Sequence, residues 1–235
     1  MLWYKAWLET RWRFVLLAGL IVFAWVMPSM ISFARVGIPQ NVPAMRVWVG
    51  VHIASMMVSV FTAIFLAGSG VNSQTTYGAS SGFHGSMFFT LSLPVTRGRL
   101  LFVRAGLGAI ECGLLVAIMG AFTLYRHPGG VTALQALLYL ARLIICSMAI
   151  YAFSTLLACL LDEMWQFTGA TLALGALLFV ENRFAVVAAT SPLRGMNLLS
   201  YPLTAPWPWT TVVASLIATG LFMFASVELL RRKEY

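Results

Sequence analysis

Two ionisable side chains interrupt long apolar stretches of this sequence, and they are the residues best placed to do chemistry. Glu111 lies about ten residues into the stretch 101–125, and Arg142 lies about eleven residues into the stretch 131–160. A charge near the middle of a bilayer is costly and usually faces a bundle interior or a cavity. We therefore predict a Glu111–Arg142 ion pair in or beside a translocation path. The alternatives are a purely structural pair, or a protonated Glu111 and a snorkelling Arg142.

Histidine and serine side chains offer little for catalysis or metal binding. The predicted topology places His52 inside an apolar stretch, His84 on the cytosolic side and His127 on the outer side, so no shared metal site is expected. Ser80 and Ser81 lie close to His84 in the run GASSGFHG, as a nucleophile and its base would. This run is interpreted as a flexible linker, because it belongs to a water-accessible loop.

Cofactor and disulfide chemistry are not indicated either. The sequence has no G-x-x-x-x-G-K-[ST] motif and no Gly-Lys pair at all, so we expect no ATP hydrolysis by a P-loop and no enzymatic activity in this chain. Cys112, Cys146 and Cys159 lie in apolar stretches without C-x-x-C spacing. They are interpreted as small packing residues.

Composition indicates the elements that must position these residues. Of 235 residues, 60% are hydrophobic and 9% are charged, whereas soluble domains carry about 25% charged residues. A helix needs roughly 20 apolar residues to cross a bilayer. We therefore predict an all-α integral membrane protein with a single transmembrane domain over 1–235. Its six spans are predicted at about 14–33, 47–68, 101–125, 131–160, 164–181 and 209–229.

Basic residues predict the orientation of these spans. The formal charge is +8, but the basic residues are divided among the boundaries of the spans and form no patch for nucleic acid. With the amino terminus inside, the cytosolic loops and ends collect nine basic residues and the outer loops five. The positive-inside bias then predicts that both termini are cytosolic in the cell membrane.

Three segments outside the spans have distinct patterns. Residues 1–13 interleave aromatic and charged side chains and predict an interfacial amphipathic helix, with a plain aromatic belt as the alternative. Residues 182–208 contain four prolines and predict short re-entrant or interfacial segments on the outer side. Residues 69–100 form the longest cytosolic connection, which begins Gly/Ser-rich and then becomes amphipathic, predicting a docked helical segment that ends before Pro94.

Small residues recur at every fourth position of the third predicted span. The row consists of Ala105, Ala109, Gly113, Ala117 and Ala121. Such a row lets another helix approach closely. It predicts a tight helix contact along this face.

The stretch TLSLPVTRGRLLFVRAGLGAIE, residues 90–111, resembles the cytosolic segment of ABC-2 type transporter permeases. Members of that family carry an "LPVSR"-like sequence just before their third span, and here residues 93–97 read LPVTR, with Thr96 where serine is common. The family is also similar in having an interfacial amino-terminal helix, six spans and a broken outer segment. One departure concerns 69–96, which lacks the acidic residue that members often carry in this loop.

The resemblance implies a permease subunit of an ABC exporter that pairs with a separate ATP-binding subunit, two copies of each, with ATP and Mg bound by that partner. The apolar spans favour an amphiphilic or apolar substrate. An intramembrane enzyme using Glu111 or a loop serine, and a non-transporting scaffold or sensor, are the alternatives. The resemblance implies contact with the ATPase through a set of coupling residues: Phe89, Leu91, Leu93, Pro94, Val95, Thr96, Arg97 and Arg99.

Overall fold

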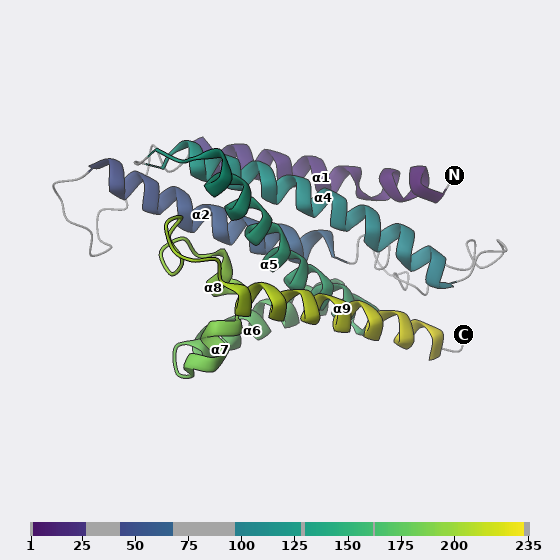
Figure 1. The fold of residues 1–235 in the computed structure, drawn as a ribbon. Coiled ribbons are helices and arrows are strands. Elements are labelled where there is room, and N and C mark those ends of the chain that lie inside the picture. Colours follow the sequence, from purple (N-terminus) through teal and green to yellow (C-terminus); the bar gives the residue numbers. More distant parts are fainter. Residues whose placement is uncertain (1, 27–42, 68–96, 128–129, 162, 233–235) are drawn as a thin grey trace.

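A computed structural model describes residues 2–26, 43–67, 97–127, 130–161 and 163–232. Every regular element in these ranges is a helix (Figure 1). The helices are α1 (Leu2–Val26), α2 (Pro43–Leu66), α4 (Arg97–Tyr125), α5 (Ala133–Leu160), α6 (Glu163–Glu181), α7 (Ala185–Thr190), α8 (Pro192–Met196) and α9 (Trp209–Arg232).

Five of these helices are long and apolar enough to cross a membrane. Their apolar portions are Trp48–Leu66, Leu101–Tyr125, Ala133–Leu160, Met164–Glu181 and Trp209–Leu229. Each coincides within a few residues with a predicted span, because length and hydropathy suffice to locate such helices. The chain is therefore a helical membrane protein.

The first predicted span falls partly outside the described residues. Helix α1 continues unbroken through residue 13, where the interfacial helix was predicted to give way to a span. Residues 27–33, the rest of that span, are not described. Trp3, Tyr4 and Trp7 are exposed on α1, as expected for an aromatic belt or an interfacial face.

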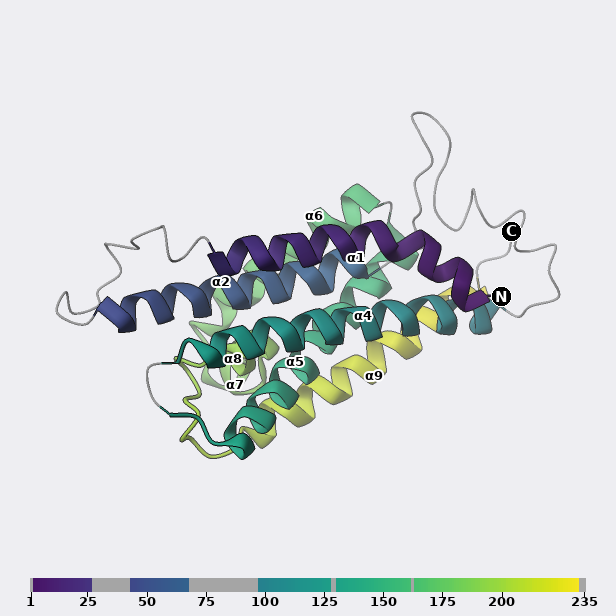
Figure 2. The ribbon, with the colours of Figure 1, turned by 90° about the horizontal axis from the view of Figure 1, so that it is seen from above.

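Helix α5 occupies the centre of the bundle. It packs against α2, α4, α6, α8 and α9, while α1 packs against α2 and α4. The first turn of α1, the first turn of α4 and the last turn of α9 lie together at one end (Figures 1 and 2). We call this the terminal end; the turn between α4 and α5 lies at the opposite end.

A capping box fixes the start of α5. The Gln135 backbone N–H donates to the Thr132 hydroxyl over 3.3 Å, and the Thr132 N–H donates to Gln135 Oε1 over 3.0 Å. Two of the N–H groups that a helix start leaves unpaired are thereby satisfied reciprocally. The first turn of the central helix is thus anchored by its own sequence.

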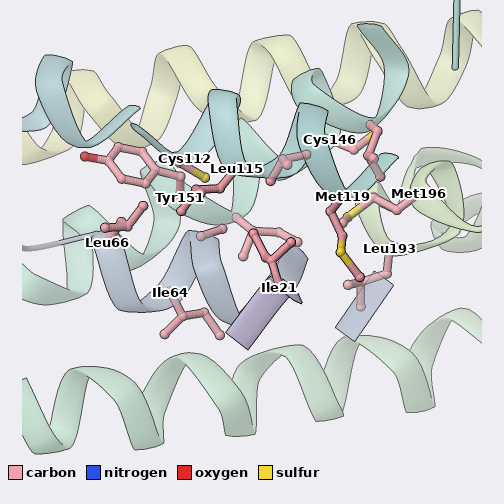
Figure 3. Close-up of a cluster of buried hydrophobic side chains, with 14 of the residues drawn as sticks. Ile21, Ile64, Leu66, Cys112, Leu115, Met119, Cys146, Tyr151, Leu193 and Met196 are labelled. Atoms are coloured by element: carbon pink, nitrogen blue, oxygen red, sulfur yellow. The ribbon is translucent and has the colours of Figure 1, made fainter. Parts of the chain in front are cut away.

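One apolar cluster joins most of the helices. It contains side chains of α1, α2, α4, α5, α6 and α8, many of which Figure 3 shows. A close approach beside it is at Gly195 of α8, where a Cβ would lie 2.6 Å from Cys146 Sγ of α5 and 2.6 Å from Thr211 Cγ2 of α9. Cys112, Cys146 and Cys159 are all buried free thiols, so their predicted role as packing residues fits their positions.

The proline-rich segment 182–208 contains two short helices. Helix α7 ends at Thr190, and α8 begins with Pro192 in its first turn, where the missing N–H of proline costs no hydrogen bond. Leu193 and Met196 of α8 are buried in the apolar cluster. The segment therefore folds back onto α5 and α9 and reaches the bundle interior.

Candidate functional site

Glu111 is buried where α4 meets α1. Its side chain is 3% exposed, and Oε1 accepts a hydrogen bond of 2.7 Å from the Thr10 hydroxyl of α1. Its other oxygen, Oε2, is buried without a hydrogen-bond partner. Glu111 therefore ties α1 to α4 through one neutral donor.

Arg142 is buried on α5 and faces the segment that follows α8. Its side chain is 5% exposed, and Nη2 donates a hydrogen bond of 3.0 Å to the Tyr201 carbonyl oxygen. The guanidinium carbon lies 5.6 Å from the Tyr139 ring centroid and 5.8 Å from that of Tyr201, while Nε is buried without a partner. Each cation–π contact stabilises the guanidinium by about 0.5–2 kcal/mol. This is less than the several kcal/mol that removing a buried ion from water costs.

The predicted Glu111–Arg142 ion pair is not formed, because the two side chains lie at different heights and have separate partners. Gly120 of α4 faces Leu140 and Leu143, so Arg142 is level with Gly120. Glu111 precedes Gly120 by nine residues, which corresponds to about 13 Å along the helix axis. Counting residues from the ends of apolar stretches did not reveal this offset.

Two histidines meet on one tryptophan at the opposite end. The Trp48 ring stacks on His52 with centroids 5.8 Å apart and meets the edge of His127 at 5.0 Å. The buried His52 Nε2 lies 3.0 Å from the Leu198 backbone nitrogen and 3.1 Å from Asn197 Oδ1, so this ring joins α2 to the segment after α8. No three His, Cys, Asp or Glu residues within the described ranges form a group suited to a metal ion; the third histidine, His84, lies outside them.

Side chains of two other helices bind the last turn of α2. Gln166 of α6 is buried, and its Nε2 donates to the carbonyl oxygens of Ile64 (3.3 Å) and Ala67 (2.9 Å). Arg13 of α1 donates to the Phe65 carbonyl over 3.3 Å. Carbonyls at a helix end lack partners within the helix and favour a cation nearby. We call this arrangement the α2 clamp; beside it lies a cavity of about 220 Å³.

Most of the predicted coupling residues lie outside the described residues: Phe89, Leu91, Leu93, Pro94, Val95 and Thr96. Arg97 is the first residue of α4, and Arg99 is exposed in its first turn. The described residues that border the predicted coupling loop are therefore the α2 clamp and the start of α4.

The partners of the buried charges were not found from the sequence. Thr10 belongs to the segment interpreted as interfacial, and Tyr201 acts through its backbone carbonyl, which no side-chain pattern reports. Gln166 did carry a signal, since an amide within an apolar stretch must find a partner.

Comparison with known proteins does not identify a family. No family model, curated protein or solved structure matches this chain.

Proposed function

We propose that this chain is the membrane-spanning permease subunit of an ATP-driven ABC exporter, with ATP hydrolysed by a separate subunit. In this proposal α1 and its continuation form the first of six spans, after an amphipathic amino-terminal turn. Two copies of the chain and two ATPase subunits form the complex, as the resemblance of residues 90–111 implies.

One structural observation carries the proposal: both helices that border the predicted coupling loop point their loop ends towards the terminal end, and one of these helix ends is held by its neighbours. Helix α4 begins at the terminal end with Arg97, whereas α2 ends short of it, beside Gly108 of α4, where a Cβ would lie 3.3 Å from the Leu66 carbonyl oxygen (Figure 1). Arg13 and Gln166 bind the last turn of α2 from α1 and α6. A movement imposed on the loop would therefore reach four helices at once.

The distribution of arginines supports a cytosolic terminal end. Seven arginines of the described segments are nearer the terminal end (Arg11, Arg13, Arg97, Arg99, Arg104, Arg231 and Arg232), and five are nearer the opposite end (Arg46, Arg126, Arg142, Arg183 and Arg194). The positive-inside bias places the richer end in the cytosol. A partner ATPase would approach the loop from that side.

An apolar or amphiphilic substrate agrees with the cavities of the bundle. A cavity of about 320 Å³ lies among α5, α6, α8 and α9. It is lined by apolar side chains, including Ile150, Phe153 and Phe222. Apolar walls favour apolar surface over a hydrated ion.

Co-purification tests the proposal. The tagged chain is isolated in mild detergent from its native cells, beside a Leu93→Asp/Arg97→Glu double variant. Eluates are examined for an ABC-type ATP-binding protein by mass spectrometry and assayed for ATPase activity. We expect both in the wild-type eluate and neither with the variant.

A matched control reverses charges at the same end of the bundle but outside the coupling loop. The Arg231→Glu/Arg232→Glu variant changes two exposed arginines of α9 and should retain the partner. Recovery of a folded wild-type chain alone, or equal partner recovery with both double variants, contradicts the proposal. Hydrolytic turnover by the isolated chain would favour an intramembrane enzyme instead.

A further inference from the structure

We propose that the cavity beside Arg142 binds a carboxylate group of a ligand. The cavity measures about 40 Å³ and lies between the first turns of α5 and the segment 202–208. Gln135 and Arg142 supply its polar lining. Its other lining residues are mostly apolar: Leu138, Tyr139, Pro202, Leu203, Ala205, Trp207 and Pro208.

The charge of Arg142 is not balanced within the described structure. Its hydrogen bond goes to the neutral carbonyl of Tyr201, and its Nε has no acceptor. Neither ion pair of the described residues involves Arg142, since both join Glu228 to arginines of α9. Because a buried ion without a counter-ion is strongly unfavourable, an anion that enters the cavity gains more there than in water.

Gln135 adds a neutral donor on the same wall. Its Oε1 is engaged by the Thr132 N–H in the capping box, which assigns the amide nitrogen to the other end of the side chain. No hydrogen bond of that nitrogen is found among the described residues, so its two N–H groups stay available. The capping box thus orients the Gln135 amide so that its N–H groups can donate to a ligand in the cavity.

Size and chemistry favour a carboxylate among anions. One water needs about 10–15 Å³ of such space, so a cavity of about 40 Å³ holds a group of roughly three heavy atoms. A carboxylate has three heavy atoms, whereas a phosphate or sulfate has five. Guanidinium and carboxylate groups also match in geometry and form short, charge-assisted hydrogen bonds.

The carboxylate has two possible sources, and the binding site does not depend on the proposed transport function. A soluble carboxylate would enter as a whole molecule. An amphiphile such as a fatty acid would insert its head group and leave its chain along the apolar walls.

Equilibrium binding to the purified chain in neutral detergent tests the site. Radiolabelled acetate and dodecanoate are the probes, and dodecanol is the uncharged control. We expect saturable carboxylate binding that dodecanol does not displace. Equal binding of both probes identifies a soluble carboxylate, and preference for dodecanoate identifies an amphiphile.

Two variants and a matched control locate the binding. Arg142→Gln should weaken carboxylate binding at least tenfold. Gln135→Glu keeps an acceptor for the Thr132 N–H but places a negative charge on the cavity wall, so it should weaken binding similarly while the chain stays folded. Arg194→Gln is the control, because it removes an exposed arginine whose guanidinium carbon lies 6.0 Å from the Tyr201 ring centroid. The affinity of this variant for the carboxylate probes should stay within twofold of wild type.

Three results would overturn the proposal. The first is that neither carboxylate binds saturably to the folded wild-type chain. The second is that binding is unchanged in folded Gln135→Glu, which stands as the test should Arg142→Gln fail to fold. The third is that chloride displaces the carboxylates at equal concentration, which would indicate a halide site.

Discussion

Buried polar side chains of this bundle are paired mainly with backbone carbonyls. Tyr151 donates to the Ala105 carbonyl over 2.8 Å and so joins α5 to α4. Thr123, Ser147 and Thr155 each donate to a carbonyl of their own helix. Because lipid offers no hydrogen bonds, a hydroxyl in a span needs a partner within the protein. Some buried atoms nevertheless have no hydrogen-bond partner among the described residues: these include the hydroxyls of Ser55, Ser59, Thr62 and Ser154, and one atom each of the ionisable Glu111 and Arg142.

Removal of the Thr10 hydroxyl should destabilise the chain through Glu111. Thr10→Val leaves the buried carboxyl without its hydrogen bond and should cost about 1–3 kcal/mol. Replacing both partners with apolar groups can be nearly neutral, so Thr10→Val/Glu111→Leu should be less destabilised than the sum of its single variants. Apparent melting temperatures in detergent measure this double-mutant cycle. Strict additivity would show that the two side chains are not coupled.

Two glycines should respond oppositely to alanine. At Gly195 a Cβ would meet Cys146 and Thr211 at 2.6 Å, and neither short side chain can move aside, so Gly195→Ala should cost about 1–3 kcal/mol. Gly220 of α9 has open space around its Cβ position. Gly220→Ala should therefore stabilise the helix by up to about 1 kcal/mol. Thermal unfolding of both variants measures these effects. Unchanged stability of Gly195→Ala would contradict the packing described for α8, and a loss of stability in Gly220→Ala would contradict the open space at α9.

Elements were predicted from the sequence far better than their contacts. Hydropathy located the five apolar helices because a span must be long and apolar whatever it touches. The row of small residues on α4 was less informative. Its first member, Ala105, is buried, but its last, Ala121, is exposed. A step of four residues advances by about 400° at 3.6 residues per turn, so the row drifts off one face.

The prediction of a Glu111–Arg142 ion pair was wrong for a related reason. Position along an apolar stretch gives the depth of a residue only if the ends of the stretch are known, and it gives no direction around the helix. The actual partners came from Thr10, in the segment interpreted as interfacial, and from Tyr201, in the proline-rich segment. Neither contact follows from periodicity, because both depend on tertiary packing.

Loss of the Gln166 amide should loosen α2 at its end. Gln166→Leu leaves the Ala67 carbonyl without its 2.9 Å hydrogen bond and should lower stability by about 1–3 kcal/mol. Hydrogen exchange should rise selectively in the last turn of α2. Thr168→Val is the control, since the exposed Thr168 binds only a carbonyl of its own helix. Unchanged exchange in α2 would mean that the clamp does not hold it.

The proposed orientation of the whole molecule can be tested with single introduced cysteines. The native thiols are all buried, so they should give little background with a membrane-impermeant maleimide. We expect Gly130→Cys, at the exposed opposite end, to label in intact cells. Arg231→Cys, exposed near the end of α9, should label only after permeabilisation. The reverse pattern would invert the proposed topology and place the LPVTR segment outside.

The α2 clamp also has a mechanical consequence. Arg13 and Gln166 grip the same helix end from two sides, through α1 and α6, while α6 packs in turn against the central helix α5. The end of α2 therefore cannot move independently of α1 and α6. A force on this helix end is divided between α1 and the middle of the bundle, so a small displacement of the end of α2 changes the spacing of helices that are remote in sequence.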